Sequence, residues 1–151
     1  MFSDRKEEAY TYFEEALRLK PQFQNAIGNM MRLDMMTGRY NQALARLPGL
    51  STNISHDPEA VKAVVDALQD PSLKPNALAL LAQSETFGYG SKTKSFYLMV
   101  LDEPDLTMDS LEKDFAAGDP RAVHIKRMDI YDPLHDNPRF QALMKKINMW
   151  P

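Results

Sequence analysis

The sequence predicts an all-α domain in which antiparallel helix pairs stack into a superhelix of about nine helices, ending in a capping helix. One observation is the placement of the ten prolines, which, apart from the terminal Pro151, fall between segments with apolar residues at helical spacing. A second is a spacing of 34 residues, typical of helical repeats, which separates Ala9 from Ala43 and Phe13 from Leu47. A third is the lack of any convincing alternation of apolar and polar residues, the pattern of half-buried strands.

The first three helices are expected over residues 4–19, 22–36 and 39–48. Pro21 ends the first of them, because proline cannot continue a helix but suits the entry to a new one. Gly38 follows the second helix and can take a positive φ there at low steric cost. These two residues therefore mark the turns of the N-terminal part.

The later helices are expected over residues 58–69, 75–86, 91–101, 107–117, 120–130 and 138–148. Some are preceded by a side chain that can cap a helix, followed by proline at the first helical position: Asp57-Pro58, Asp119-Pro120 and Asn137-Pro138. Residues 96–101 could by composition form a buried strand. Nothing nearby would pair with such a strand, so a buried helix is favoured.

Small and large apolar residues recur at set offsets in the N-terminal third. Where two helices approach closely a small residue is needed, and Ala9 and Ala43 fill that place. Each is followed four residues later, on the same helix face, by a large side chain, Phe13 or Leu47. This pattern resembles one and a half tetratricopeptide repeats, whose unit is an antiparallel helix pair. The residues that define it are Ala9, Phe13, Ala16, Pro21, Ile27, Gly38, Tyr40, Ala43 and Leu47.

The chain departs from the family pattern at two positions. Met31 stands where the family usually carries Gly or Ala, and Asp34 where it often carries Tyr. In this register residues 4–19 form the second helix of a repeat, whose first helix would precede Met1. We therefore expect either a fragment of a longer protein or a capping helix with one exposed flank, and the fragment is favoured.

A second resemblance covers the C-terminal part. Residues 111–120 and 132–143 resemble the closing segment of bacterial tetratricopeptide domains that follow winged-helix transcription regulators, adenylate cyclases and protein kinases. Pro138 would start the capping helix, and Phe140 would cover the final hairpin. A tryptophan common in those domains is replaced by the Arg-Ala-Val-His of residues 121–124. The resemblance implies an interaction or sensory module of a bacterial signalling or transcription-regulatory protein.

Length and composition fit one domain over residues 1–151, with the clearest repeats in 1–50, degenerate repeats in 51–117 and a cap in 118–151. The net charge of −3 includes no basic stripe, which argues against direct binding of nucleic acid. No apolar run approaches the ~18 residues that a membrane span needs. The chain lacks cysteine, so its compartment stays open. The cytoplasm is favoured, with the periplasm as the alternative.

We expect no catalytic, cofactor or metal site. The histidines, His56, His124 and His135, do not have the spacing of metal ligands. Residues 88–93, Gly-Tyr-Gly-Ser-Lys-Thr, fail the spacing of a phosphate-binding loop. The chain is therefore not expected to be an enzyme. In the alternative reading, it regulates a cyclase or kinase whose catalytic part lies upstream.

The expected partner site lies on the groove-facing side of residues 22–36, where Asn25, Arg32 and Met35 would be exposed. One arginine and soft methionines suit a protein or peptide ligand that is apolar or mildly acidic, bound as a helix or an extended segment. Core packing is favoured for Met30 and Met31. Self-association through residues 4–19 is a further alternative.

Overall fold

The structure, a computed structural model, describes residues 2–50, 57–84, 92–118, 125 and 128–147. Every regular element in these ranges is helical, which confirms the all-α prediction. The α-helices are α1 (Phe2–Leu19), α2 (Gln24–Met36), α3 (Tyr40–Arg46), α4 (Pro58–Gln69), α5 (Lys74–Gln83), α6 (Lys92–Val100), α7 (Pro104–Ala116) and α8 (Pro138–Lys146). The short 3₁₀ helices are η1 (Leu47–Gly49), η2 (Pro71–Leu73) and η4 (Asp129–Leu134).

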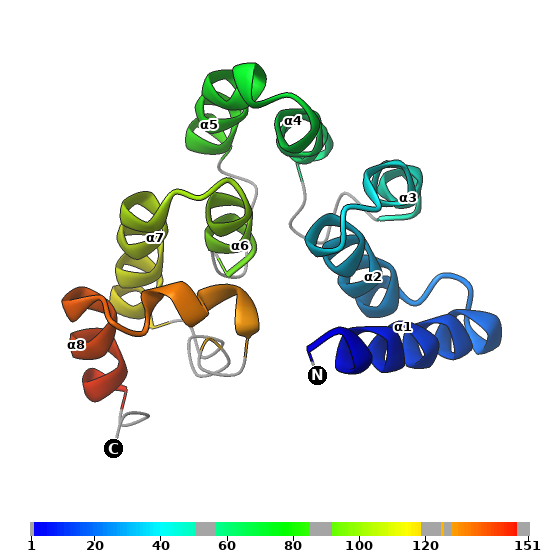
Figure 1. Cartoon of the computed structure of the whole chain (residues 1–151), viewed down its shortest axis with the longest axis horizontal. Coiled ribbons are helices and arrows are strands. Elements are labelled where there is room, and N and C mark those ends of the chain that lie inside the picture. Colours follow the sequence, from blue (N-terminus) through cyan, green and yellow to red (C-terminus); the bar gives the residue numbers. More distant parts are fainter. Residues whose placement is uncertain (1, 51–56, 85–91, 119–124, 126–127, 148–151) are drawn as a thin grey trace.

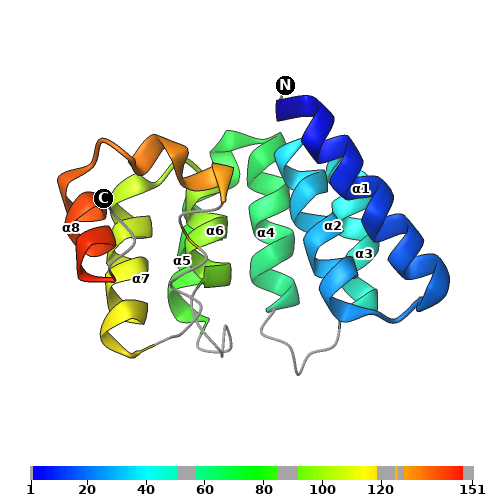
Figure 2. The ribbon, with the colours of Figure 1, turned by 90° about the horizontal axis from the view of Figure 1, so that it is seen from below.

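The helices form successive antiparallel pairs along a curved path (Figure 1). α2 pairs with α3, α4 with α5, and α6 with α7, and these pairs have the most extensive contacts between elements. α1 and η4 lie at opposite ends of the curve. The curvature brings the start of α1 towards η4, as two perpendicular views show (Figure 1 and Figure 2).

The hairpin of α2 and α3 forms as the sequence predicts. Ala43 is fully buried, and Tyr40 and Leu47 are half-buried against the same apolar cluster. Ile27 is also buried. Gly38 ends α2 with a φ of +74°, a conformation that glycine adopts without the steric penalty of a Cβ atom.

Asp34, one of the departures from the repeat pattern, is fully buried. Its Oδ2 accepts a hydrogen bond from Arg46 Nε at 2.7 Å. Arg46 also donates through Nη2 to the hydroxyl of Tyr10, at 2.6 Å. A buried carboxylate needs such a partner, because losing its hydration is otherwise very unfavourable. This ion pair therefore links α2 to α3 and, through Tyr10, to α1.

α1 differs from the expectation drawn from the repeat pattern. Ala9, Phe13 and Ala16 were predicted to pack as repeat core residues, but all are only half-buried. None of the described side chains of α1 belongs to the buried core. The reason is that α2 is the only element with which α1 has extensive contact. Beyond α2, the side chains of Glu7 and Tyr10 make polar contacts with Arg39 and Arg46, and much of the remaining surface of α1 faces solvent.

Two of the predicted helix caps are confirmed. The side chain of Asp57 accepts hydrogen bonds from the backbone of Glu59 and Ala60, at 3.1 and 3.2 Å. Asn137 Oδ1 accepts from the backbone of Arg139 at 2.9 Å. These bonds satisfy N–H groups that have no partner within the helix.

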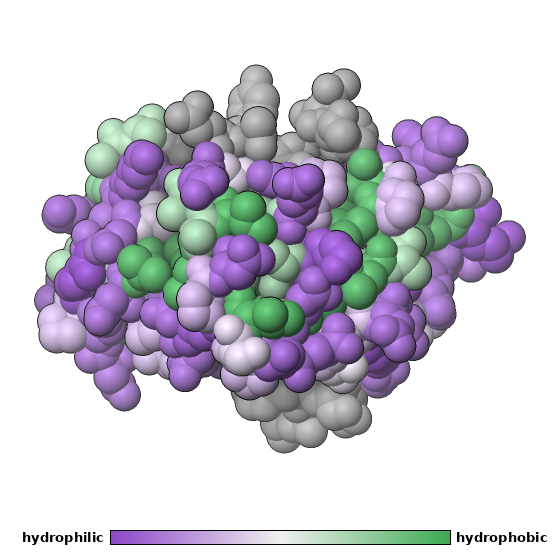
Figure 3. Space-filling view, turned by 90° about the horizontal axis from the view of Figure 1, so that it is seen from above, coloured by the Kyte–Doolittle hydropathy of each residue, from purple (hydrophilic) through white to green (hydrophobic). Residues whose placement is uncertain are grey.

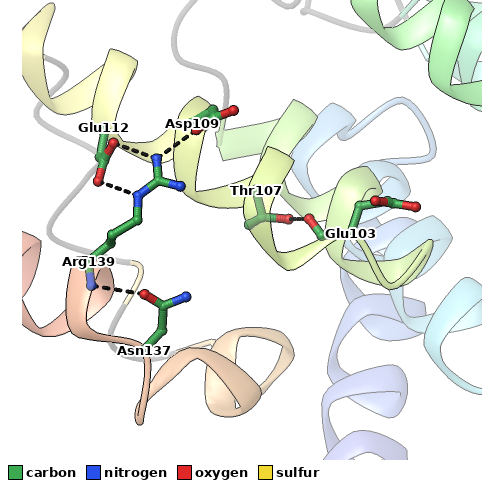
Figure 4. A network of polar contacts seen from close by, with 6 residues as sticks. All are labelled: Glu103, Thr107, Asp109, Glu112, Asn137 and Arg139. Atoms are coloured by element: carbon green, nitrogen blue, oxygen red, sulfur yellow. Dashed lines mark hydrogen bonds and ion pairs between the residues drawn. The ribbon is translucent and has the colours of Figure 1, made fainter.

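Several helix boundaries differ from the prediction; α5, for example, ends at Gln83 and not at residue 86. Two further differences have a clear local cause. The helix expected over 39–48 ends at Arg46, and the chain continues as the 3₁₀ turn η1. α7 begins at Pro104, three residues earlier than expected, because proline suits the first helical turn. Thr107 supports this start by donating from Oγ1 to the carbonyl of Glu103 at 2.7 Å (Figure 4).

In the C-terminal half, the structure confirms one predicted helix and differs from another. Residues 96–100 belong to α6, so helix was the correct choice over strand. The helix predicted over 120–130 and its Asp119-Pro120 cap lie largely outside the described residues. At the end of that range η4 forms a 3₁₀ helix instead, with Pro133 inside it.

The C-terminal cap has an apolar core of its own. Phe140, Leu143 and Met144 of α8 are buried against Met108 and Leu111 of α7. Outside this core, Arg139 of α8 binds two carboxylates of α7 (Figure 4): Nε and Nη2 donate to Glu112 at 3.0 and 2.7 Å, and Nη2 also donates to Asp109 at 2.6 Å. The cap is therefore held by both apolar packing and ion pairs.

Candidate functional site

The structure separates the three residues of the expected partner site. Asn25 is exposed in the first turn of α2. Arg32 is half-buried: its Nη1 donates to Asn29 Oδ1 at 3.1 Å, and its Cζ lies 5.8 Å from the ring centre of Phe96. Met35 is only 3% exposed, inside the main apolar cluster. The prediction that Met35 lies on an exposed groove is therefore wrong.

The physical reason is that α2 is covered on more than one side. It packs against α1 as well as α3, and Phe96 of α6 lies near Arg32 from across the curve. Gly28, seven residues before Met35 and therefore on the same face of α2, is buried too. A helix that packs against several neighbours exposes only a narrow strip of its surface. On α2 this exposed strip includes Asn25 but not Met35.

An apolar pocket lies where the start of α1 meets α2 and η4. Its volume is about 270 Å³. α1 contributes Arg5, Lys6 and Ala9 to its lining, and α2 contributes Leu33 and Met36. Leu33 and Met36 are three residues apart, so they share one face of α2. Both are half-buried, and thus the pocket has an apolar wall that reaches the surface.

The opposite wall comes from the C-terminal part of the chain. Met128, Asp129 and Ile130 line it. Met128 and Ile130 are half-buried and also pack against the core clusters, while Asp129 is exposed. The rim therefore carries two basic side chains on α1 and one acidic side chain on η4.

The chemistry of the lining suits binding. The described side chains around the pocket include no histidine and no hydroxyl group. Among the residues that the structure describes, no group of histidine, aspartate and glutamate side chains is placed to hold a metal ion. Nor is any described helix long and apolar enough to cross a membrane. The pocket can shield an apolar group from water and place charge beside it.

Sequence reasoning missed this pocket because its walls lie at opposite ends of the chain. Ala9 and Ile130 belong to segments that no local pattern connects. The one available signal was the pair Leu33 and Met36 on a face of α2 away from the buried Met31 and Met35. That signal shows a second apolar face on α2 without showing what covers it.

Comparison with known proteins adds no relative. No protein-family model, no curated protein and no solved structure matches the chain. The resemblance to tetratricopeptide repeats therefore rests on the residues between Ala9 and Leu47 and on the C-terminal residues 111–143.

Proposed function

We propose that this chain is a protein-interaction module that binds a peptide or helix of another protein and carries out no bond chemistry. The observation that supports this most directly is the open apolar pocket between α1, α2 and η4. Stacked helix pairs commonly present concave binding surfaces, because each repeat adds a small rotation. The lining of the pocket comes from α1 and α2 at one end of the curve and from η4 and Met128 at the other. The curvature brings these elements towards each other (Figure 1).

The size of the pocket supports recognition of a side chain. Sites for drug-sized ligands and cofactors usually measure about 300–1,000 Å³. A pocket of about 270 Å³ lies below that range. It suits one large side chain of a bound polypeptide better than a whole cofactor.

Seen from above, apolar side chains form several patches separated by hydrophilic ones (Figure 3). Leu73 and Leu106, each 42% exposed, belong to different hairpins. Scattered apolar residues of this kind are normal on protein surfaces.

The setting of the module is also part of the proposal. The resemblance of residues 111–143 to the ends of bacterial regulatory domains supports a place in a signalling or transcription-regulatory protein. A role as the regulatory part of a cyclase or kinase would use the same surface.

Self-association through α1 is the second candidate function. Tyr12 and Leu19 are 68% and 71% exposed, and they lie seven residues apart on one helix face. A second copy of α1 could cover them. Sedimentation velocity between about 5 and 500 μM tests this, since a dimer with a Kd in that range would give a sedimentation coefficient that rises with concentration. A constant monomer would remove this candidate.

Selection from a random dodecapeptide phage library tests the main proposal. The chain is immobilised, and the library is first depleted on the bare support. We expect a recurring sequence pattern whose synthetic peptide binds with a dissociation constant of about 1–100 μM, the range of modest peptide interfaces. Isothermal titration calorimetry measures that constant. Failure to enrich any pattern would contradict peptide recognition.

A further inference from the structure

We propose that the pocket between α1 and η4 binds an acidic peptide, with one apolar side chain in the pocket and a carboxylate facing Arg5 and Lys6. This inference rests on the proposed function and names the site and the chemistry of the partner. The apolar lining, the charges of the rim and their placement on opposite walls support it separately.

The apolar lining favours a large apolar side chain of the ligand, because flexible residues of the lining can adjust to its shape. Leu33 and Ile130 supply branched surface, and Met36 and Met128 supply flexible thioethers. Methionine side chains fill irregular gaps and are common on adaptable binding surfaces. An apolar side chain of the peptide leaves water on entering such a pocket, and this burial drives binding.

The positive charge of the rim includes a lysine without a counter-ion. Arg18, Arg39 and Arg46 are paired with Glu15, Glu7 and Asp34, respectively. By contrast, no described residue forms a hydrogen bond or ion pair with the half-buried Lys6. Its methylenes can lie along apolar surface while the ammonium group stays at the rim. A carboxylate of a ligand would be a partner for this ammonium group.

The negative charge on the opposite wall gives the ligand a direction. Asp129 lies on the η4 side and would repel a second carboxylate there. The acidic residue of the peptide should therefore lie on the α1 side of its apolar anchor. On the η4 side the peptide should carry a neutral or basic residue.

The peptides recovered by phage selection provide the probe. We expect them to share a large apolar residue with Asp or Glu within two positions on one side and none on the other. Lys6→Glu should raise the dissociation constant by about tenfold or more, because an attraction at the rim becomes a repulsion. Ala9→Leu should also raise the dissociation constant by about tenfold, because the larger side chain fills the pocket without changing its charge.

Two further variants complete the design. Lys145→Glu makes the same charge change on an exposed residue of α8 outside the pocket, and should alter the constant by no more than about twofold. Asp129→Lys should instead strengthen binding, by about threefold, because it removes the repulsion on the η4 wall. Circular dichroism melting curves check that each variant is folded. If Lys6→Glu does not fold, Asp129→Lys still tests the assigned charges, because it should lower the dissociation constant where Lys6→Glu should raise it.

The possible failures are distinguishable. Peptides that bind equally well to wild type, Lys6→Glu and Ala9→Leu would overturn the pocket as the site and leave the proposed function standing. Enriched peptides without an acidic residue would overturn the assigned ligand chemistry. If no peptide is enriched, both this inference and the proposed function are contradicted.

Discussion

The two end helices of the curve, α1 and α8, are attached to the molecule in different ways. α8 places Phe140 and Met144 fully inside an apolar cluster, and Arg139 adds a bidentate ion pair outside it. α1 contributes no buried side chain among its described residues. It is joined to its neighbours by half-buried contacts with α2 and by polar contacts of Glu7 and Tyr10.

This difference shows where the molecule is well packed and where it can respond to a partner. Exposed ion pairs contribute about 0–1 kcal/mol, whereas a fully buried large side chain contributes about 1.5–3 kcal/mol. α1 therefore has the lower local stability and opens more readily. Because α1 also forms one wall of the pocket, a ligand bound there would hold α1 against the rest of the chain. The following predictions test this contrast, from the largest expected effect to the smallest.

Phe140→Ala should lower the free energy of unfolding by about 3–5 kcal/mol, because it leaves a cavity in the C-terminal cluster. Urea denaturation followed by circular dichroism measures the loss. Phe13→Ala is the matched variant on α1. Since Phe13 is half-buried, its loss should be clearly smaller, about 1–2 kcal/mol. Equal losses would show that α1 is packed as firmly as the cap.

Ala43→Trp should destabilise the fold by about 1–3 kcal/mol or more, since Ala43 is fully buried and the site admits only a small side chain. Ala9→Trp makes the same change at the corresponding position of α1. Ala9 is half-buried and lines the open pocket, so a smaller fall in melting temperature is expected. Differential scanning calorimetry compares them. A melting temperature unaffected by Ala43→Trp would mean that the contact between α2 and α3 is wrongly described.

The ion pair of the cap should make stability depend on pH. The hydrogen bonds from Arg139 lower the pKa of the Glu112 carboxyl below its usual 4.5. The unfolded chain thus binds the proton at a higher pH than the folded chain does. The stabilisation is present above the unfolded pKa and is lost as the pH falls through the folded pKa. Arg139→Gln should therefore reduce the loss of stability below about pH 4.5.

Urea denaturation at a series of pH values checks this. The side chain of Glu112 is 42% exposed, so the effect will be modest. Arg18→Gln, at the exposed pair with Glu15 on α1, serves as the control because it leaves the cap unchanged. A variant with Arg139→Gln that keeps the full pH dependence of the wild type would contradict the assigned role of this ion pair.

The smallest effect concerns the polar contacts of α1. Glu7→Gln should cost less than about 1 kcal/mol of global stability, because the pair with Arg39 is largely exposed. It should nevertheless speed hydrogen exchange of the α1 amides selectively, since local opening depends on these contacts. Mass spectrometry of exchanged peptides measures this. Uniform acceleration in α1 and α8 would argue against a separately opening α1.

The sequence by itself determined the helical character of the described residues and several of the helix ends. Asp57 and Asn137 cap helices, and Gly38 ends one, through interactions within a few residues. The repeat pattern also identified Ala43 as a packing position, and the resemblance of the C-terminal segment identified Phe140; both are fully buried. Because caps and turns depend on residues close together in the sequence, the sequence alone is enough to predict them. The boundaries at Arg46 and Pro104 differ from the prediction because a 3₁₀ turn follows Arg46, and because proline and the Thr107 hydroxyl support an earlier start of α7.

Only the tertiary structure decided which helix faces are covered. Met35 lies in the core and Arg32 is half-buried near Phe96, a residue of α6 far along the chain. α1 remains half-exposed because, among the described elements, only α2 packs extensively against it. The pocket joins Lys6 to Ile130 across the two ends of the curve. Helical periodicity identifies an apolar face, but the neighbour of that face depends on how successive pairs rotate. That rotation is the sum of many small packing choices, and no single segment encodes it.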